Sequence, residues 1–136
     1  MTQVNDTGSG QRAHVEVRDL EVSFAERLQE RGLDVVYPGL PEHPGHDRLR
    51  ELMNPGYGYG GIFCLDLKEA SAANELLEHL QNDVGFGYMA VSLGYFDTLM
   101  SLSASSTSSE LSEEEQRRAG ISPGLVRVSI GYTGTL

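Results

Sequence analysis

Arg127 is the single charged residue in an otherwise apolar and small-residue segment, residues 124–132, which reads Gly-Leu-Val-Arg-Val-Ser-Ile-Gly-Tyr. The alternation of its large apolar residues with the others predicts a strand that buries one face and carries Arg127 on the opposite face. A guanidinium among apolar neighbours needs an anionic partner, and its planar fork suits a carboxylate. The segment therefore predicts a carboxylate-binding arginine, and an edge-strand arginine that points into water is the alternative.

Two further segments resemble binding motifs. Residues 55–61, Pro-Gly-Tyr-Gly-Tyr-Gly-Gly, are rich in glycine like a phosphate-binding loop. They precede a predicted strand instead of opening a helix, however, and they lack a Lys-Ser/Thr ending, so we expect a tightly turned loop. His43 and His46 are three residues apart in a proline-bearing loop without a cysteine or acidic ligand at standard spacing, and we expect no metal site.

Cysteine and lysine, whose thiol and amine can act as nucleophiles, occur once each in the chain. Cys64 lies mid-strand among Ile, Phe and Leu, where a buried thiol is inert. Lys68 is the one lysine of the chain and neighbours Asp66 and Glu69. A lysine paired with acids keeps a high pKa and is a poor imine-forming amine. We therefore expect this chain to contribute no catalytic and no cofactor-binding residue.

The composition excludes several classes of protein. The 136 residues suffice for one domain, and a net charge of −10 argues against nucleic acid or an anionic membrane as the partner. A single cysteine rules out an internal disulfide and fits a reducing compartment. The sequence has neither a membrane-length apolar run nor a signal-peptide pattern, so we expect a cytoplasmic protein.

The periodicity of apolar residues predicts the elements. Residues 1–12 are expected to be a disordered tail, and residues 13–136 one domain of class α/β (an α+β layer). We expect helices over 13–31, 46–53 and 71–82, a short helix that begins with a capping box of Ser112 and Glu115, and strands over 33–37, 61–67, 84–93 and 124–132. These predict a small, mostly antiparallel sheet of three or four strands with helices on one face. The serine-rich residues 101–112 are either a solvated linker or a loop over a ligand.

Three segments, taken in order, resemble one enzyme family. They are Val-Tyr-Pro-Gly-Leu-Pro-Glu-His-Pro-Gly-His at 36–46, Ala-Val-Ser-Leu-Gly at 90–94 and Ala-Gly-Ile-Ser-Pro-Gly-Leu-Val-Arg-Val-Ser-Ile-Gly at 119–131. From about Leu33 to Gly131 the chain resembles the C-terminal domain of the Cys/Met-metabolism enzymes that use pyridoxal phosphate. This family includes methionine γ-lyases, cystathionine γ-lyases and cystathionine γ-synthases, and the methionine γ-lyases look most similar.

The resemblance implies the small domain of a fold-type I pyridoxal-phosphate enzyme. Arg127 matches the arginine that pairs with the substrate α-carboxylate, and Ser92 and Leu93 match the Ser-Leu of the same pocket. For Ser92, a satisfied strand-end hydroxyl is the alternative. Residues 100–108 replace a His-Pro-Ala-Ser-Met-Thr-His-like run of many members, which leaves substrate preference open.

The family also carries a large N-terminal domain with the cofactor and its Schiff-base lysine, which has no match here. The resemblance therefore implies a carboxylate-binding subunit or domain of a C–S lyase or transferase that acts on sulfur-containing or γ-substituted amino acids. We expect a larger pyridoxal-phosphate-binding subunit as its partner, in a hetero- or homo-oligomer. The alternative is a truncated, non-catalytic paralogue or fragment that acts only in assembly or binding.

Overall fold

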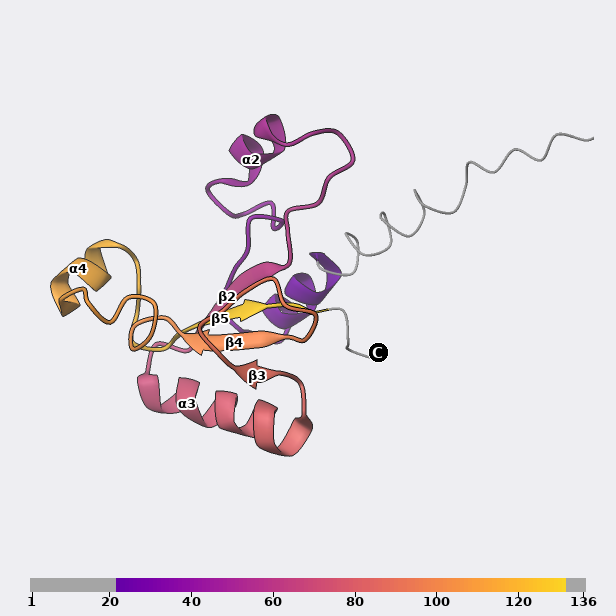
Figure 1. The fold of residues 1–136 in the computed structure, drawn as a ribbon. Helices are drawn as coiled ribbons and strands as arrows, with labels where there is room; N and C mark the ends of the chain where they lie inside the picture. Colours follow the sequence, from indigo (N-terminus) through magenta and orange to yellow (C-terminus); the bar gives the residue numbers. More distant parts are fainter. Residues whose placement is uncertain (1–21, 132–136) are drawn as a thin grey trace, which may run out of the picture.

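Five strands form one sheet in the order β1-β2-β5-β4-β3 (Figure 1). The computed structural model describes residues 22–131. Neighbouring strands are antiparallel except β3 and β4, which run parallel. The strands are β1 (Val35–Val36), β2 (Ile62–Asp66), β3 (Tyr88–Met89), β4 (Leu99–Leu102) and β5 (Leu125–Ser129). Because β5 is the central strand, the alternative of an edge-strand Arg127 is wrong.

The predicted fold class is confirmed, but the strand count and one strand position are wrong. The sequence predicted no strand at β4, because Ser101 and the serines after it look like a polar tract, yet all four β4 residues are buried. The predicted strand over 84–93 is reduced to β3. Before β3 the chain forms a π-helical turn, Leu80–Val84, that ends at Gly85 with a φ of 69°. A positive φ of this kind is accessible to glycine at little cost, so Gly85 ends the turn there.

Helices lie on one face of the sheet, as predicted, but two helices do not pack on it. Residues 22–30 are helical, followed by α2 (His46–Leu52), α3 (Ala70–His79) and α4 (Glu113–Arg118). The first helix and α3 each contribute buried residues to the core, whereas α2 and α4 contribute none. Figure 1 shows α2 and α4 carried away from the sheet on long connections. The predicted tail 1–12 and helical residues 13–21 lie outside the described residues.

The hydrophobic core fills the space between one sheet face and these two helices. Strand register aligns the buried sheet residues on that face, and burial of a full apolar side chain contributes about 1.5–3 kcal/mol. The core residues are Ala25, Val35, Tyr37, Leu40, Phe63, Leu65, Ala73, Leu77, Met100, Leu102, Val126 and Val128. The opposite face of the sheet does not contribute to this core, and it carries Arg127.

A polar cluster ties together the ends of three strands. Lys68, which follows β2 with a φ of 66°, donates through Nζ to Asp66 Oδ2 at 2.7 Å and to Asp34, which precedes β1. Ser122, just before β5, donates to Asp66. Burial alone would raise the pKa of Asp66, but the hydrogen bonds from Lys68 and Ser122 outweigh it and lower that pKa. The hydrogen bonds to Asp34 and Asp66 raise the pKa of Lys68.

This cluster predicts an acid-sensitive part of the folding stability. Because the pKa of Asp66 is lower in the folded chain, its stabilisation is present above the unfolded value of about 3.9 and is lost as the pH falls through the folded value. Asp66→Asn should lower the free energy of unfolding by about 1–2 kcal/mol at pH 7, measured by urea denaturation. The gap to the wild type should close between about pH 4 and pH 2.

The matched control is Asp47→Asn, since Asp47 makes an exposed ion pair with Arg50 and such pairs contribute little. A destabilisation of Asp66→Asn that stays constant from pH 7 to pH 2 would contradict the assignment.

Candidate functional site

The candidate site is a row of four side chains that crosses the sheet on the face opposite the core. The register places Val36, Cys64, Arg127 and Ser101 directly opposite one another on β1, β2, β5 and β4. Residues paired in this way project from the same face of the sheet. The only charged member, Arg127, therefore has a thiol on one side and a hydroxyl on the other.

Arg127 has unused hydrogen-bonding capacity. Its Nη2 donates to the backbone carbonyl of Ser92 at 2.9 Å, and its Nε is buried without a hydrogen-bond partner in the described residues. Within residues 22–131, Arg127 forms no ion pair. A guanidinium has five N–H donors and pairs bidentately with carboxylates. The geometry therefore leaves Arg127 able to bind an external anion.

The segment between β3 and β4 folds back over the row and brings Ser92 to Arg127. Gly94 N–H donates to the Ser129 hydroxyl at 3.1 Å, which fixes the segment on β5. Ser92 reaches Arg127 through its backbone carbonyl, and the adjacent Leu93 side chain is 55% exposed. The structure thus brings together two of the residues predicted for the carboxylate pocket and leaves Leu93 beside them. Their role in substrate binding stays a prediction.

The far end of this segment is held by a close approach at Gly131. A Cβ on Gly131 would lie 2.2 Å from the carbonyl carbon of Asp97, so a larger residue would displace the segment. Gly131 N–H also donates to Thr98 Oγ1 at 3.1 Å. The ends of β5 and of the Ser92 segment are therefore locked together, which sets the distance between Ser92 and Arg127.

Cys64 gives Arg127 a neutral neighbour. The hydrogen bonds Leu67 N–H to Gly124 O and Ile130 N–H to Gly61 O place the Cys64–Arg127 pair between hydrogen-bonded positions, where side chains lie closest. Burial raises the pKa of the Cys64 thiol, and the nearby Arg127 charge lowers it by less. The thiol stays protonated near neutral pH, as the sequence predicted, and does not supply the missing anion.

The glycine-rich and histidine segments have structural contacts. The loop before β2 is held by Tyr37 Oη, which donates to Gly60 O at 3.0 Å. His46 contacts Pro38 O through Nδ1 at 2.9 Å and Tyr59 Oη through Nε2 at 3.1 Å. The loop leads into β2 and not into a helix, which agrees with the turned loop expected here. In the described part of the chain, no three His, Cys, Asp or Glu side chains gather as metal ligands would.

The start of the serine-rich tract is buried, which rules out a solvated linker there, whereas residues 109–112 are exposed. Ser101 and Ser103 are buried, and Ser106 Oγ donates to Leu102 O at 2.6 Å. Gln116 Nε2 donates to the carbonyls of Ala104 and Ser108 at 3.1 and 2.8 Å. Sequence reasoning missed Ser101 as a neighbour of Arg127, because only the strand register of β4 brings the two residues together.

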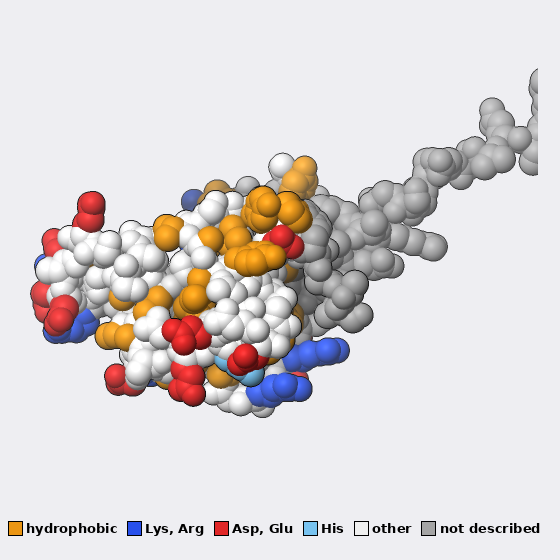
Figure 2. Space-filling model, turned by 60° about the horizontal axis from the view of Figure 1, so that its bottom comes forward, with side chains coloured by type: hydrophobic (Ala, Val, Ile, Leu, Met, Phe, Trp, Pro, Cys, Tyr) orange, Lys and Arg blue, Asp and Glu red, His pale blue; other side chains and the backbone are white. Residues whose placement is uncertain are grey.

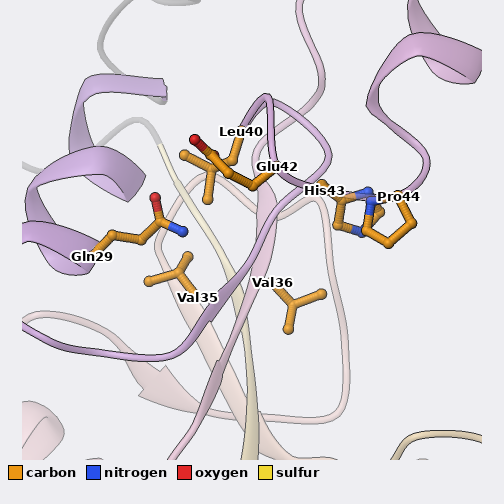
Figure 3. Close-up of a pocket in the computed structure, with 7 residues that line it drawn as sticks. All are labelled: Gln29, Val35, Val36, Leu40, Glu42, His43 and Pro44. Carbon is orange, nitrogen blue, oxygen red and sulfur yellow. The ribbon is translucent and has the colours of Figure 1, made fainter.

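A cavity of about 320 Å³ lies away from Arg127, at the β1 edge. Figure 3 shows its lining side chains, which come from the first helix, β1 and the loop that follows it: Gln29, Val35, Val36, Leu40, Glu42, His43 and Pro44. The lining includes neither Arg127 nor Ser92, and its one charged residue, Glu42, is an acid and would repel a carboxylate. This cavity is not the carboxylate site.

An exposed apolar surface borders the site. Hydrophobic side chains gather on one face of the molecule in Figure 2. Eight exposed apolar residues follow one another in sequence from the end of the π-helical turn to the residues before β4, and we call them the 84–96 surface: Val84, Phe86, Tyr88, Met89, Val91, Leu93, Tyr95 and Phe96, each at least 36% exposed. Clusters of exposed apolar residues often mark interaction sites. Within the described residues, no helix is long and apolar enough to cross a membrane.

Comparisons with known proteins agree with the resemblance seen in the sequence. The family described as Cys/Met metabolism PLP-dependent enzyme matches residues 22–134. A methionine gamma-lyase of Arabidopsis thaliana is 54% identical over 113 residues, which is 83% of this chain and 26% of that protein. An L-methionine gamma-lyase of Fusobacterium nucleatum subsp. polymorphum is 39% identical over 97 residues, 71% of this chain and 23% of that protein. The chain thus spans about a quarter of these relatives.

Solved structures show the same fold. A cystathionine gamma synthase of Xanthomonas oryzae pv. oryzae, in complex with aminoacrylate and cysteine, matches with a TM-score of 0.72 and 31% identity. The match covers 90% of this chain and 30% of that one. A putative O-acetylhomoserine (thiol)-lyase of Campylobacter jejuni, which contains a pyridoxyl-lysine monophosphate, matches with a TM-score of 0.72 and 26% identity, over 89% of this chain and 27% of that one.

The contact between Cys64 and Arg127 can be tested through the ionisation of the thiol. Because the guanidinium lowers the pKa of Cys64, Arg127→Met should raise that pKa further, and Arg127→Lys should keep it close to the wild-type value. The pH dependence of the iodoacetamide alkylation rate measures the pKa directly. An unchanged or lower midpoint in Arg127→Met would show that the two side chains are not in contact.

Proposed function

The chain belongs to the family of Cys/Met-metabolism enzymes that depend on pyridoxal phosphate, and we propose that this domain binds the substrate α-carboxylate through Arg127. The observation that carries the proposal is the state of that guanidinium. It stands on the central strand, is oriented by the Ser92 carbonyl, lacks an ion pair within residues 22–131 and has a neutral thiol beside it. A guanidinium that has no acidic partner within residues 22–131 is suited to bind an anionic ligand.

The reaction class we propose is that of a C–S lyase or transferase, similar to methionine γ-lyase. The identity to the Arabidopsis methionine gamma-lyase supports this choice over the more distant cystathionine lyases. The substrates would be sulfur-containing or γ-substituted amino acids, whose shared feature is the α-carboxylate that Arg127 would hold. Ser92 and Leu93 would line the same pocket. We also propose a cytoplasmic location for the protein, as expected from the sequence.

The cofactor does not fit the residues of this chain. Pyridoxal phosphate supplies an electron sink to such enzymes and requires an amine to which it attaches. The only lysine in the sequence, Lys68, is held by Asp34 and Asp66, and these hydrogen bonds raise its pKa. The glycine-rich loop before β2 does not open a helix that would receive a phosphate. We therefore assign the cofactor to a larger, lysine-bearing part, which is either a partner subunit or a continuation of the same polypeptide.

The contribution of this domain is then positional. Holding the carboxylate fixes the orientation of the amino acid, and such positioning can lower a reaction barrier by several kcal/mol. The 84–96 surface supports association with the larger part, because it is apolar and contains Leu93 beside Ser92. The outward N–H of Met89 on the edge strand donates to Gln81 Oε1 at 2.7 Å. This bond occupies the N–H group that an added strand would need. The larger part would therefore contact this domain through side chains.

The proposal predicts a large effect of Arg127 on turnover. In a chimera that joins this chain to the remaining three quarters of the Arabidopsis relative, Arg127→Ala should lower kcat/KM for methionine about 10²-fold, since a lost charged pair costs about 2–3 kcal/mol. Arg117→Ala is the matched control, because Arg117 makes an exposed pair with Glu114. An active chimera that is indifferent to Arg127→Ala would disprove the role. A folded, cofactor-loaded chimera without activity would favour the non-catalytic alternative.

The 84–96 surface predicts a specific loss of association. Val91, with 61% of its side chain exposed, should tolerate Val91→Asp in the isolated chain but should not when a partner covers it. Affinity purification of the tagged chain from its host should recover a lysine-bearing partner with the wild type and not with Val91→Asp. Leu52→Asp on α2, also exposed, should leave recovery unchanged. Equal recovery with both variants would remove this surface from the interface.

A further inference from the structure

Two buried polar atoms that have no hydrogen-bond partner within residues 22–131 belong to neighbouring members of the row. They are Ser101 Oγ and Arg127 Nε, and the Ser101 residue is only 5% exposed. An unpaired buried donor or acceptor is uncommon in native proteins, because it loses its hydration without compensation. Two such atoms side by side indicate a contact that this state of the chain does not make.

The strand geometry makes the two groups natural partners. The bond from Ser103 N–H to Leu125 O sets the alternation of the β4–β5 ladder, which makes Ser101 and Arg127 a hydrogen-bonded pair with Cα atoms about 5.5 Å apart. The Nε–H group is a donor, and a serine hydroxyl accepts. Their side chains share one face, so a small rotation of the Arg127 side chain would join them.

The Ser92 carbonyl explains why they are apart. It accepts from Nη2 at 2.9 Å and so holds the guanidinium towards the folded-back segment. On the other side of Arg127, the Cys64 thiol is neutral and a weak acceptor, and does not compete with Ser101 for Nε. The guanidinium therefore has two alternative oxygen partners, of which the ligand-free chain uses one.

We propose that Ser101 is a positioning residue for Arg127, an inference that rests on the proposed carboxylate-binding function. When a carboxylate engages the guanidinium, Nη2 leaves the Ser92 carbonyl and Nε–H donates to Ser101 Oγ. The inner edge of the guanidinium is then fixed to β4, and both Nη groups face the carboxylate as a fork. Ser101 does not touch the substrate; it sets the direction in which Arg127 presents its charge.

If Ser101 has this role, Ser101→Ala should weaken carboxylate binding without lowering the melting temperature of the free chain. In the free chain the substitution removes an unpaired buried hydroxyl, so the melting temperature should stay the same or rise. In the bound state it removes the acceptor of Nε–H, so carboxylate affinity should fall. Ser101→Thr keeps the hydroxyl and should keep the affinity. A serine with only a structural role would not alter carboxylate binding.

The experiment is an NMR titration of the whole chain at constant ionic strength, with acetate as the probe and acetamide as its neutral isostere. Acetate should shift the Arg127 Nε–Hε signal downfield in the wild type and in Ser101→Thr, and acetamide should not. In Ser101→Ala the dissociation constant should rise about fivefold, and the downfield shift should be absent.

The outcomes separate the two proposals. Equal affinity and equal Nε–Hε shifts in wild type and Ser101→Ala overturn the role of Ser101 and leave the carboxylate site intact. Absence of any acetate effect on Arg127 in the wild type overturns the proposed function together with this inference. A lower melting temperature of Ser101→Ala than of the wild type also overturns the inference, because it would show that the hydroxyl is already paired in the free chain.

Discussion

A positive charge in the middle of a sheet is the constraint on which the rest of this domain depends. Arg127 occupies the central strand β5, where it is half-buried and where no acid within residues 22–131 neutralises it. Charges in such places are costly unless they are paired or hydrogen-bonded. The Ser92 carbonyl satisfies one donor, and the others remain for a ligand. The fold thus leaves N–H donors of Arg127 available for a ligand, and the hydrogen bonding of that side chain within the described residues is incomplete.

One face of the sheet holds the hydrophobic core, and the other carries the proposed binding site. One face is sealed by the helix at 22–30 and by α3, whose apolar residues join those of the strands in one core. This packing holds β2, β5 and β4 in register, and the register alone aligns Cys64, Arg127 and Ser101 on the other face. The close approach at Gly131 then locks the Ser92 segment over them. Changes in core packing would therefore be felt at the site through strand register.

The same arrangement supports the proposal that the reactive groups lie in a larger part outside this domain. The chain aligns with about a quarter of its relatives, and its one lysine is tied to two carboxylates at the end of β2. The exposed 84–96 surface consists of large apolar residues and includes Leu93, the neighbour of Ser92 in sequence. The proposed carboxylate site, bordered by these residues, would suit a domain that closes one side of an active site whose reactive groups lie elsewhere.

The sequence by itself determined the elements with strong local signals. The alternation around Arg127, the apolar periodicity of α3 and the capping box of Ser112 with Glu115 each act within one segment, and the structure has all three. Each of these three features depends on neighbouring residues, so one segment suffices to reveal it. The family required three segments taken in order, and the resemblance then placed Ser92 and Arg127 in one pocket.

Only the tertiary structure decided the position of β5 and the neighbours of Arg127. Strand β4 escaped detection because Ser101 and the serines after it look like a polar tract, and its pairing partner lies about 25 residues away in the sequence, where no local pattern reaches. The central place of Arg127, the neutral Cys64 beside it and the unpaired Ser101 hydroxyl all follow from strand register. Register is set by packing of the whole core, and for that reason the chemistry of this site could not be read from its residues one segment at a time.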